Sequence, residues 1–217
     1  MTQDLCLSIP KEKQPVLLGL SGGPDSILLF YKLLEKNISF TVAHVDHGWR
    51  EKSSDECLFL SSLCSKHQVP FFHKILGFMP KKNIEEEGRI ERLRFFKEVY
   101  EKEHCKQLLL GHHKTDRVET VLKKILEGAS LDKLNSFKTC TQLYGMEVYR
   151  PLLSWTKKEI LEYLNEKKIT YFFDETNDDT KFLRARMRVE IIPFLEEKFK
   201  KNFQNNLLSH VEAVEEL

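Results

Sequence analysis

The chain of 217 residues is long enough for one large domain, or for one domain with an appendage. Hydrophobic residues make up 41% and charged residues 31%, which allows both a real core and a well-charged surface. The formal net charge is only +1, so any binding of nucleic acid would have to rest on a local basic patch.

Cysteine usage and apolar runs narrow the class of protein further. The five cysteines form no Cys-x-x-Cys pair and are odd in number, which argues against a disulfide framework, a zinc site and an iron–sulfur cluster. The N-terminal segment lacks a basic region followed by a long apolar stretch, and no apolar run approaches membrane-spanning length. We therefore expect a soluble, cytoplasmic protein.

The first predicted strand leads directly into a Gly-rich segment. The apolar run Pro15–Leu20 precedes Ser21–Ser26, which reads Ser-Gly-Gly-Pro-Asp-Ser, and a helix is predicted over Asp25–Lys36. This layout presents backbone N–H groups and a helix N-terminus to a phosphate. No Gly-Lys-Ser/Thr follows, so the segment is not a Walker A loop. The hydroxyls of Ser21 and Ser26 are expected to donate to phosphate oxygens.

Asp25 is the unusual residue of this loop. A carboxylate would be repelled by a phosphate unless a cation lay between them, so Asp25 predicts a bound Mg²⁺ ion. The alternative is a tight strand-to-helix turn in which Asp25 is an ordinary residue of the first helical turn. The whole hexapeptide at this position favours the phosphate loop.

Strand-like and helix-like segments alternate as far as Leu126. Strands are predicted at Pro15–Leu20, Ile38–Val45, Phe71–Leu76 and Gln107–Gly111, and helices at Asp25–Lys36, Ser54–His67, Ile84–His104 and Arg117–Leu126. The alternation predicts an α/β fold, with a mostly parallel sheet and helices on both faces. Ligands of such sheets bind at the carboxyl ends of the strands. Polar clusters fall at three of those ends, in Ser21–Ser26, His44–Arg50 and Gly111–Asp116.

The second and third clusters offer different chemistry. In His44–Arg50, two histidines three residues apart lack a third metal ligand nearby, so we favour contacts to a nucleotide or phosphate over mere capping of a strand. In the third cluster, Asp116 and Glu119 are spaced so that both carboxylates can face one site. They would hold Mg²⁺ or a cationic substrate, and ordinary helix capping is the alternative.

Two basic segments are candidates for RNA contacts. Arg89 and Arg92 lie three residues apart on a predicted helix, where a solvated charged face is the default. The stretch Lys181–Lys201 has seven Lys or Arg against three Glu, a local net charge of +4. Arg184 and Arg188 share one helical face of it, which fits contacts to an RNA backbone or, alternatively, a basic solvated helix.

The second half of the chain has a different pattern. A hairpin is predicted over Lys138–Tyr149 with its turn at Tyr144-Gly145, and a capping box at Thr156–Glu159 opens a helix through Lys167. A short strand at Thr170–Phe173 and a polar turn at Asp174–Asp179 are predicted to follow. The rest is predicted as a helix over Phe182–Phe199 with a break at Pro193, a linker at Lys198–Asn206 and a helix from Leu207. We expect an α/β domain that carries the phosphate loop over 1–130, the remainder of a catalytic domain with the hairpin and the basic helix over 131–200, and the start of a C-terminal helix or linker over 201–217.

Together these residues resemble the tRNA(Ile)-lysidine synthetase family of the PP-loop ATP pyrophosphatases. The Ser21–Ser26 loop marks the superfamily, whereas His44–Arg50 and His112–Thr120 are much more specific motifs. The resemblance runs from Val16 to about Leu195, and three further segments extend it in order: Arg150–Leu153, Asp174–Asn177 and Arg184–Arg188.

The resemblance implies a fold, a reaction and partners. The fold would be Rossmann-like, of the adenine nucleotide alpha hydrolase-like type, with a small C-terminal helical extension. The enzyme would be a ligase that joins L-lysine to C2 of the wobble cytidine, position 34, of tRNA(Ile) with a CAU anticodon. ATP would first adenylate O2 of the cytidine with release of pyrophosphate, and the lysine amine would then displace AMP. Mg²⁺ would accompany ATP, and a homodimer stays open as the assembly.

The resemblance also suggests roles for individual residues. ATP-binding residues would be Ser21, Gly22, Gly23, Pro24, Asp25, Ser26, His44, His47, Arg50 and His112. Asp25 would bind Mg²⁺, Asp116 and Glu119 would bind lysine, and His113 would help to deprotonate the amine; with Asp25 these form the expected catalytic set. Contacts to tRNA would come from Arg89, Arg92, Arg184 and Arg188.

Three positions depart from the family pattern, and other functions compete. Thr115 stands where the family often has an acid, Ala185 interrupts an Arg-Asn-x-x-Arg pattern, and Leu93 replaces an aromatic residue. One competing function is that of a tRNA thiolase, which would be expected to carry Cys-x-x-Cys pairs, and this chain has none. A non-catalytic module that binds ATP and tRNA is the alternative from a different class, and turnover separates it from the enzyme.

Overall fold

The computed structural model describes residues 7–46, 53–76, 84–134, 137–172 and 183–213. Its strands are β1 (Val16–Gly19), β2 (Phe40–Asp46), β3 (Phe71–Ile75), β4 (Gln107–Leu109), β5 (Cys140–Leu143) and β6 (Met146–Tyr149). Its α-helices are α1 (Pro24–Glu35), α2 (Ser53–Lys66), α3 (Ile84–Lys102), α4 (Lys114–Leu126), α5 (Leu131–Leu134), α6 (Lys157–Glu166), α7 (Leu183–Arg186), α8 (Ile192–Phe199) and α9 (Phe203–Ala213). A 3₁₀ turn at Lys11–Lys13 precedes β1.

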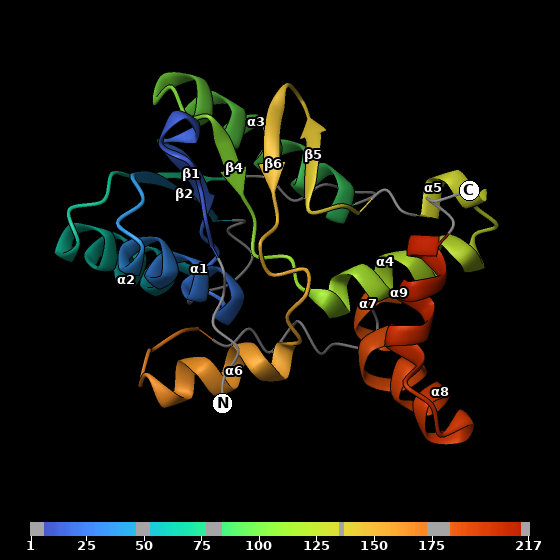
Figure 1. Ribbon diagram of the computed structural model, residues 1–217. Coiled ribbons are helices and arrows are strands. Elements are labelled where there is room, and N and C mark those ends of the chain that lie inside the picture. Colours follow the sequence, from blue (N-terminus) through green and yellow to red (C-terminus); the bar gives the residue numbers. More distant parts are fainter. Residues whose placement is uncertain (1–6, 47–52, 77–83, 135–136, 173–182, 214–217) are drawn as a thin grey trace.

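The strands form one mostly parallel sheet in the order β3-β2-β1-β4-β6-β5 (Figure 1). Strand β1 pairs in parallel with β2 and β4, and the antiparallel hairpin β5–β6 extends the sheet beyond β4. The α/β prediction is therefore confirmed. Since β2, β1 and β4 are neighbours running in one direction, the segments that leave their carboxyl ends emerge at the same edge.

Each face of the sheet is covered by helices, as predicted. Helices α1 and α2 cover one face and α6 packs on α1, with Ile27, Leu60 and Ile160 of these helices completely buried. Helix α3 covers the other face with Leu93 and Phe96, together with side chains of the hairpin. A strand such as β1 contributes apolar side chains to both faces and is therefore a continuous apolar run.

The C-terminal helices form a second, smaller core with α4. Val118 and Val121 of α4 pack with Met187, Ile192 and Leu208. Figure 1 shows α7, α8 and α9 as a group that projects from the sheet beside α4. Helix α4 therefore connects the sheet edge, where it begins, to the C-terminal helices.

Local signals in the second half of the chain gave mixed results. The hairpin turn is confirmed, with positive φ values of 52° at Tyr144 and 78° at Gly145. The strand predicted at Thr170–Phe173 is wrong over its described residues, 170–172. The Phe172 N–H donates instead to the Gly22 carbonyl at 2.9 Å, and the ring packs edge-on against Phe59, so this segment lines the Gly-rich loop.

The helix predicted to break at Pro193 runs on through that residue. Between α7 and α8 the chain forms a π-helical segment, Met187–Ile191, and Pro193 lies in the first turn of α8. Because proline has no N–H to donate, the widened turn just before it accommodates the missing hydrogen bond without ending the helix. Segments 47–52 and 173–182, which contain His47, Arg50 and the predicted turn at Asp174–Asp179, lie outside the described residues.

Candidate nucleotide and RNA site

The Gly-rich loop is a tight turn closed by its two serines. Gly22 has a φ of +85°, which glycine adopts without strain. The Ser21 N–H donates to Ser26 Oγ at 3.2 Å, and that hydroxyl donates to the Gly23 carbonyl at 3.0 Å. Helix α1 has Gly23 as its N-cap, so no capping side chain occupies its first N–H groups. The loop thus leaves these donors for an anion.

The segment after β4 packs directly on this loop. A Cβ atom at Gly111 would lie 3.1 Å from both the Asp25 carbonyl carbon and the Ser26 nitrogen. A side chain there would push the two backbones apart by a few tenths of an ångström, so glycine suits this close approach. The first and third polar clusters of the sequence are therefore in contact at the sheet edge.

Asp25 is paired with a lysine from a distant part of the chain. Lys157 Nζ lies 2.8 Å from Asp25 Oδ1 and 2.7 Å from Oδ2. Both side chains remain reachable from solvent, with 38% of the Lys157 side chain and 22% of the Asp25 side chain exposed. Lys157 is the first residue of α6, after a complete Thr156–Glu159 capping box. The sequence indicated only that a helix begins near Lys157, through the capping box, and did not predict its contact with Asp25.

His113 lies between two carboxylates. Its Nε2 atom is 3.9 Å from Asp25 Oδ1 and 3.7 Å from Asp116 Oδ2, and its backbone N–H donates to Asp116 Oδ2 at 2.9 Å. Burial opposes ionisation of Asp116, but the histidine charges and this N–H outweigh it, so the pKa of Asp116 is lowered. An ionised Asp116 near His113 suits an ammonium ligand.

Glu119 is held by an arginine rather than facing open space. Its side chain is fully buried, and Arg188 donates from Nε to Oε1 at 2.7 Å and from Nη2 to Oε2 at 3.2 Å. Burial raises the pKa of Glu119 although Arg188 acts in the opposite direction. Arg188 Nη2 also lies 3.8 Å from Asp116 Oδ1. The arginine therefore links the two carboxylates of α4 to the π-helical segment.

His44 is a buried residue within β2. Its Nδ1 lies 2.8 Å from the carbonyl oxygen of Leu20, the residue just before the loop. Burial lowers the pKa of His44, so the neutral imidazole can donate to that carbonyl. His44 thus supports the base of the Gly-rich loop.

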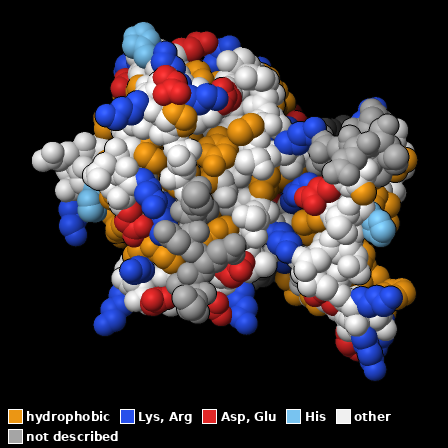
Figure 2. Space-filling model, in the orientation of Figure 1, with side chains coloured by type: hydrophobic (Ala, Val, Ile, Leu, Met, Phe, Trp, Pro, Cys, Tyr) orange, Lys and Arg blue, Asp and Glu red, His pale blue; other side chains and the backbone are white. Residues whose placement is uncertain are grey.

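Arg92 of α3, Arg184 of α7 and Arg150, which follows β6, lie near His112, and Arg89 of α3 lies near Arg92 and Arg150. Burial lowers the pKa of Arg92, and the positive charges of Arg89 and Arg184 lower it further. Burial likewise lowers the pKa of the His112 imidazole to about 4, and the charge of Asp116 only partly opposes this. Three guanidinium groups add to the lowering, those of Arg150, Arg92 and Arg184. In Figure 2, several Lys and Arg side chains lie where the projecting C-terminal helices meet the rest of the molecule.

An aromatic ring connects His112 to one of these arginines. The Phe137 ring lies edge-on to His112 at 5.0 Å, and Arg150 Cζ stands 4.9 Å from its centroid. Arg150 Nη1 donates to the Lys138 carbonyl and to Thr141 Oγ1. The buried atoms His112 Nδ1 and Arg150 Nε have no hydrogen-bond partner among the described residues. Arg150 belongs to a sequence motif whose pattern indicates no role for it, and no sequence pattern pointed to Phe137.

Two of the departures from the family pattern are core positions. Leu93 is 3% exposed in the core beneath α3, and Ala185 is 4% exposed on the inner side of α7.

In the part of the chain that the structure describes, no group of three or more His, Cys, Asp or Glu residues is placed to hold a metal ion. Among the described helices, none is both long and apolar enough to cross a membrane.

Solved structures share this fold at low sequence identity. A U34-tRNA thiolase, NcsA, from Methanococcus maripaludis superposes with a TM-score of 0.70 at 20% identity, over 93% of this chain and 72% of that chain. NMN synthetase from Francisella tularensis follows with a TM-score of 0.51 at 10% identity, over 71% and 62%. At these identities the likeness is one of fold alone.

Sequence relatives are much closer. The chain is 42% identical to the tRNA(Ile)-lysidine synthase of Chlamydia muridarum over 209 residues, which is 95% of this chain and 65% of that protein. It is 43% identical to the tRNA(Ile)-lysidine synthase of Protochlamydia amoebophila and 39% identical to that of Chlamydia pneumoniae, covering 95% and 99% of this chain. The chain spans 46% of the former relative and 68% of the latter. A family model described as PP-loop domain matches residues 2–195. On these matches, the chain belongs to the tRNA(Ile)-lysidine synthase family of PP-loop proteins.

Proposed function

We propose that this chain joins L-lysine to C2 of the wobble cytidine, position 34, of tRNA(Ile) with a CAU anticodon, at the expense of ATP. The observation that carries the proposal is the junction at the sheet edge, where Gly111 brings the Asp116 segment against the Gly-rich loop. Donors for a phosphate, carboxylates for an ammonium group and guanidinium groups for an RNA therefore lie around one region. Membership of the family supports the same reaction.

The Gly-rich loop is the proposed site of the ATP phosphates. In the first step, O2 of the cytidine attacks the α-phosphorus, the bond from that phosphorus to the bridging oxygen breaks, and pyrophosphate leaves. The loop and α1 N–H groups stabilise the charge that builds on the phosphates. His44 supports the loop through its contact with the Leu20 carbonyl.

Mg²⁺ is part of the proposal, and Asp25 fits it as a ligand. The ion usually takes one or two carboxylates and fills its other positions with phosphate oxygens and water, so one exposed carboxylate is enough. Asp25 is partly exposed beside the loop, and Lys157 would have to release one of its two oxygens. The bound ion would neutralise phosphate charge during release of pyrophosphate.

Asp116 is the proposed contact for the substrate lysine. It is ionised and partly exposed, whereas Glu119 is fully buried and bound by Arg188, so Glu119 acts through that arginine. In the second step the lysine amine attacks C2, the bond from C2 to the adenylated oxygen breaks, and AMP leaves. His113, between Asp25 and Asp116, is placed to accept the proton of the amine.

The arginine cluster is the proposed contact for tRNA. Like charges held close together without compensation are costly unless an anion binds among them. Arg92 and Arg184 have no acidic partner among the described residues, whereas Arg89 pairs with Glu86 of its own helix. Arg150 with Phe137 and His112 offers a surface on which a base can stack. Arg188, by contrast, is engaged by Glu119 and serves the tRNA indirectly.

The test is incorporation of radiolabelled lysine into two transcripts, tRNA(Ile) and tRNA(Met), both with a CAU anticodon. We expect ATP-dependent labelling of the isoleucine transcript alone, and its loss in Asp25→Ala. An Asp55→Ala variant, altered at an exposed acid of α2, serves as the control. If ATP binds but neither transcript is labelled, the chain is a non-catalytic module that binds ATP and tRNA.

A further inference from the structure

The ion pair between Lys157 and Asp25 joins parts of the chain that are 132 residues apart. Both carboxylate oxygens lie within 2.8 Å of the ammonium nitrogen. No sequence motif assigned a role to this lysine. Its ammonium nevertheless reaches the carboxylate that follows the Gly-rich loop, at the point where a phosphate would be repelled.

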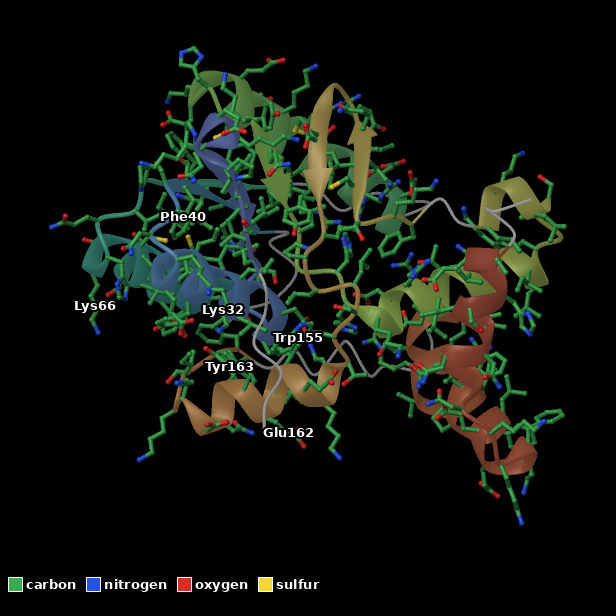
Figure 3. The ribbon with its side chains drawn as sticks, in the orientation of Figure 1. Lys32, Phe40, Lys66, Trp155, Glu162 and Tyr163 are labelled. Carbon is green, nitrogen blue, oxygen red and sulfur yellow. The ribbon has the colours of Figure 1, made fainter. Side chains whose placement is uncertain are left out.

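Helix α6 holds Lys157 in place from its first residue onward. The Thr156 hydroxyl and backbone N–H both donate to Glu159 Oε2 at 2.7 Å. The inner face of α6 packs on α1, where the Tyr163 hydroxyl donates to Glu35 at 3.0 Å and Lys32 stands 4.3 Å from the Tyr163 ring centroid. Figure 3 shows Tyr163 and Trp155 on the side of α6 that faces α1, with Glu162 on the outer side.

The backbone before α6 also touches the Asp116 segment. The Lys114 N–H donates to the Trp155 carbonyl at 2.9 Å, and Trp155 is 3% exposed. The start of α6 is therefore tied to both the loop side and the α4 side of the sheet edge. Lys157 is a positioned side chain rather than a surface lysine that happens to find an acid.

We infer that Lys157 is a phosphate-binding residue of the nucleotide site, presented by Asp25, and that it contacts the phosphates of bound ATP. This inference rests on the proposed function and deepens it. An ammonium group has three N–H donors, so Lys157 can keep a hydrogen bond to one Asp25 oxygen while another N–H donates to a phosphate oxygen. As the ammonium moves toward the phosphate, one Asp25 oxygen becomes free for a cation. One carboxylate thereby serves first as the partner of Lys157 and then as a ligand of the metal that accompanies ATP.

The experiment measures binding by titration calorimetry of an ATP analogue with a methylene bridge between its α- and β-phosphorus atoms, and separately of adenosine. Lys157→Met should weaken binding of the analogue about 10- to 100-fold, the factor for losing a hydrogen bond between charged groups. Binding of adenosine should stay unchanged. Lys158→Met is the matched control, because Lys158 is the next residue of α6, with 83% of its side chain exposed, and pairs with Glu162.

A double variant separates a phosphate contact from mere neutralisation of Asp25. If Lys157 binds phosphate, Asp25→Asn combined with Lys157→Met binds the analogue at least as weakly as the single lysine variant. If the double variant regains wild-type affinity, or if Lys157→Met weakens adenosine equally, the inference is wrong. Equal binding of the analogue by wild type and Lys157→Met overturns this inference alone. Failure of the wild-type chain to bind the analogue overturns the proposed function and the inference together.

Discussion

The charges of the site are arranged differently in its two regions. Around the Gly-rich loop and α4, each described acid has a basic partner: Asp25 has Lys157, and Glu119 has Arg188. Around His112, burial lowers the pKa values of Arg92 and Arg150, and neighbouring guanidinium groups lower them further. Paired charges hold a structure together, whereas unbalanced like charges are stabilised by a ligand of opposite sign. The difference separates residues that stabilise the structure of the site from residues proposed to bind the RNA.

The largest expected effect comes from breaking a pair in the first region. Arg188→Met leaves Glu119 buried without its partner and should lower the free energy of unfolding by about 3–5 kcal/mol. Arg184→Met, four residues earlier in the same helical run and exposed, should change it by less than about 0.5 kcal/mol. Urea unfolding followed by circular dichroism measures both. Equal losses in the two variants would remove the distinction between the regions.

The second effect is acid sensitivity arising from His112. Its pKa in the folded protein is about 4, below the ordinary 6.5, so the unfolded chain binds a proton first as pH falls. Stability should therefore decrease by about 3 kcal/mol between pH 6.5 and pH 4 from this residue, and not above pH 6.5. His112→Asn should flatten that part of the pH profile. An unchanged slope in the variant would show that His112 protonates freely in the folded state.

A smaller effect is expected at the start of α6. Thr156→Ala removes the capping hydroxyl and should cost about 1 kcal/mol of stability. Because this cap also positions Lys157, binding of the ATP analogue should weaken as well. Thr170→Ala, an exposed threonine beyond the same helix, is the control. If analogue binding is unaffected while stability falls, the cap stabilises α6 without orienting Lys157.

The smallest effect concerns RNA binding in the second region. If Arg184 contacts a phosphate, Arg184→Met should reduce the slope of log K against log salt concentration by about 1. Fluorescence titration of a labelled tRNA(Ile) transcript at several salt concentrations gives the slope. Arg94→Met, at an exposed arginine of α3 paired with Glu91, should leave it unchanged. An unaltered slope in Arg184→Met would place the RNA elsewhere.

The position of the loop was predictable because its cause is local. An apolar strand, two glycines and a following helix are read from adjacent residues, and parallel pairing brings the ends of β1 and β4 together. The position of Asp116 at this edge was predictable for the same reason. The close packing at Gly111 could not be foreseen, because it is a backbone contact between two segments that are far apart in the sequence.

The partners of the acids were not predictable because their cause is tertiary packing. Lys157 reaches Asp25 through the docking of α6 on α1, and Arg188 reaches Glu119 through the packing of the C-terminal helices on α4. Sequence spacing placed Arg184 and Arg188 on one face with one role. Their different burial and partners become visible only when the π-helical segment directs Arg188 toward α4.

The most direct test of the account is the release of labelled product from ATP, measured while the concentrations of ATP and tRNA(Ile) are varied separately. The account predicts release of pyrophosphate that depends on tRNA. It also predicts that Lys157→Met raises the ATP concentration required for half-maximal release of pyrophosphate, and that Arg184→Met raises the tRNA concentration required for it. Release of inorganic phosphate, or a shift of the same requirement in both variants, would contradict the division of the site into a nucleotide region and an RNA region.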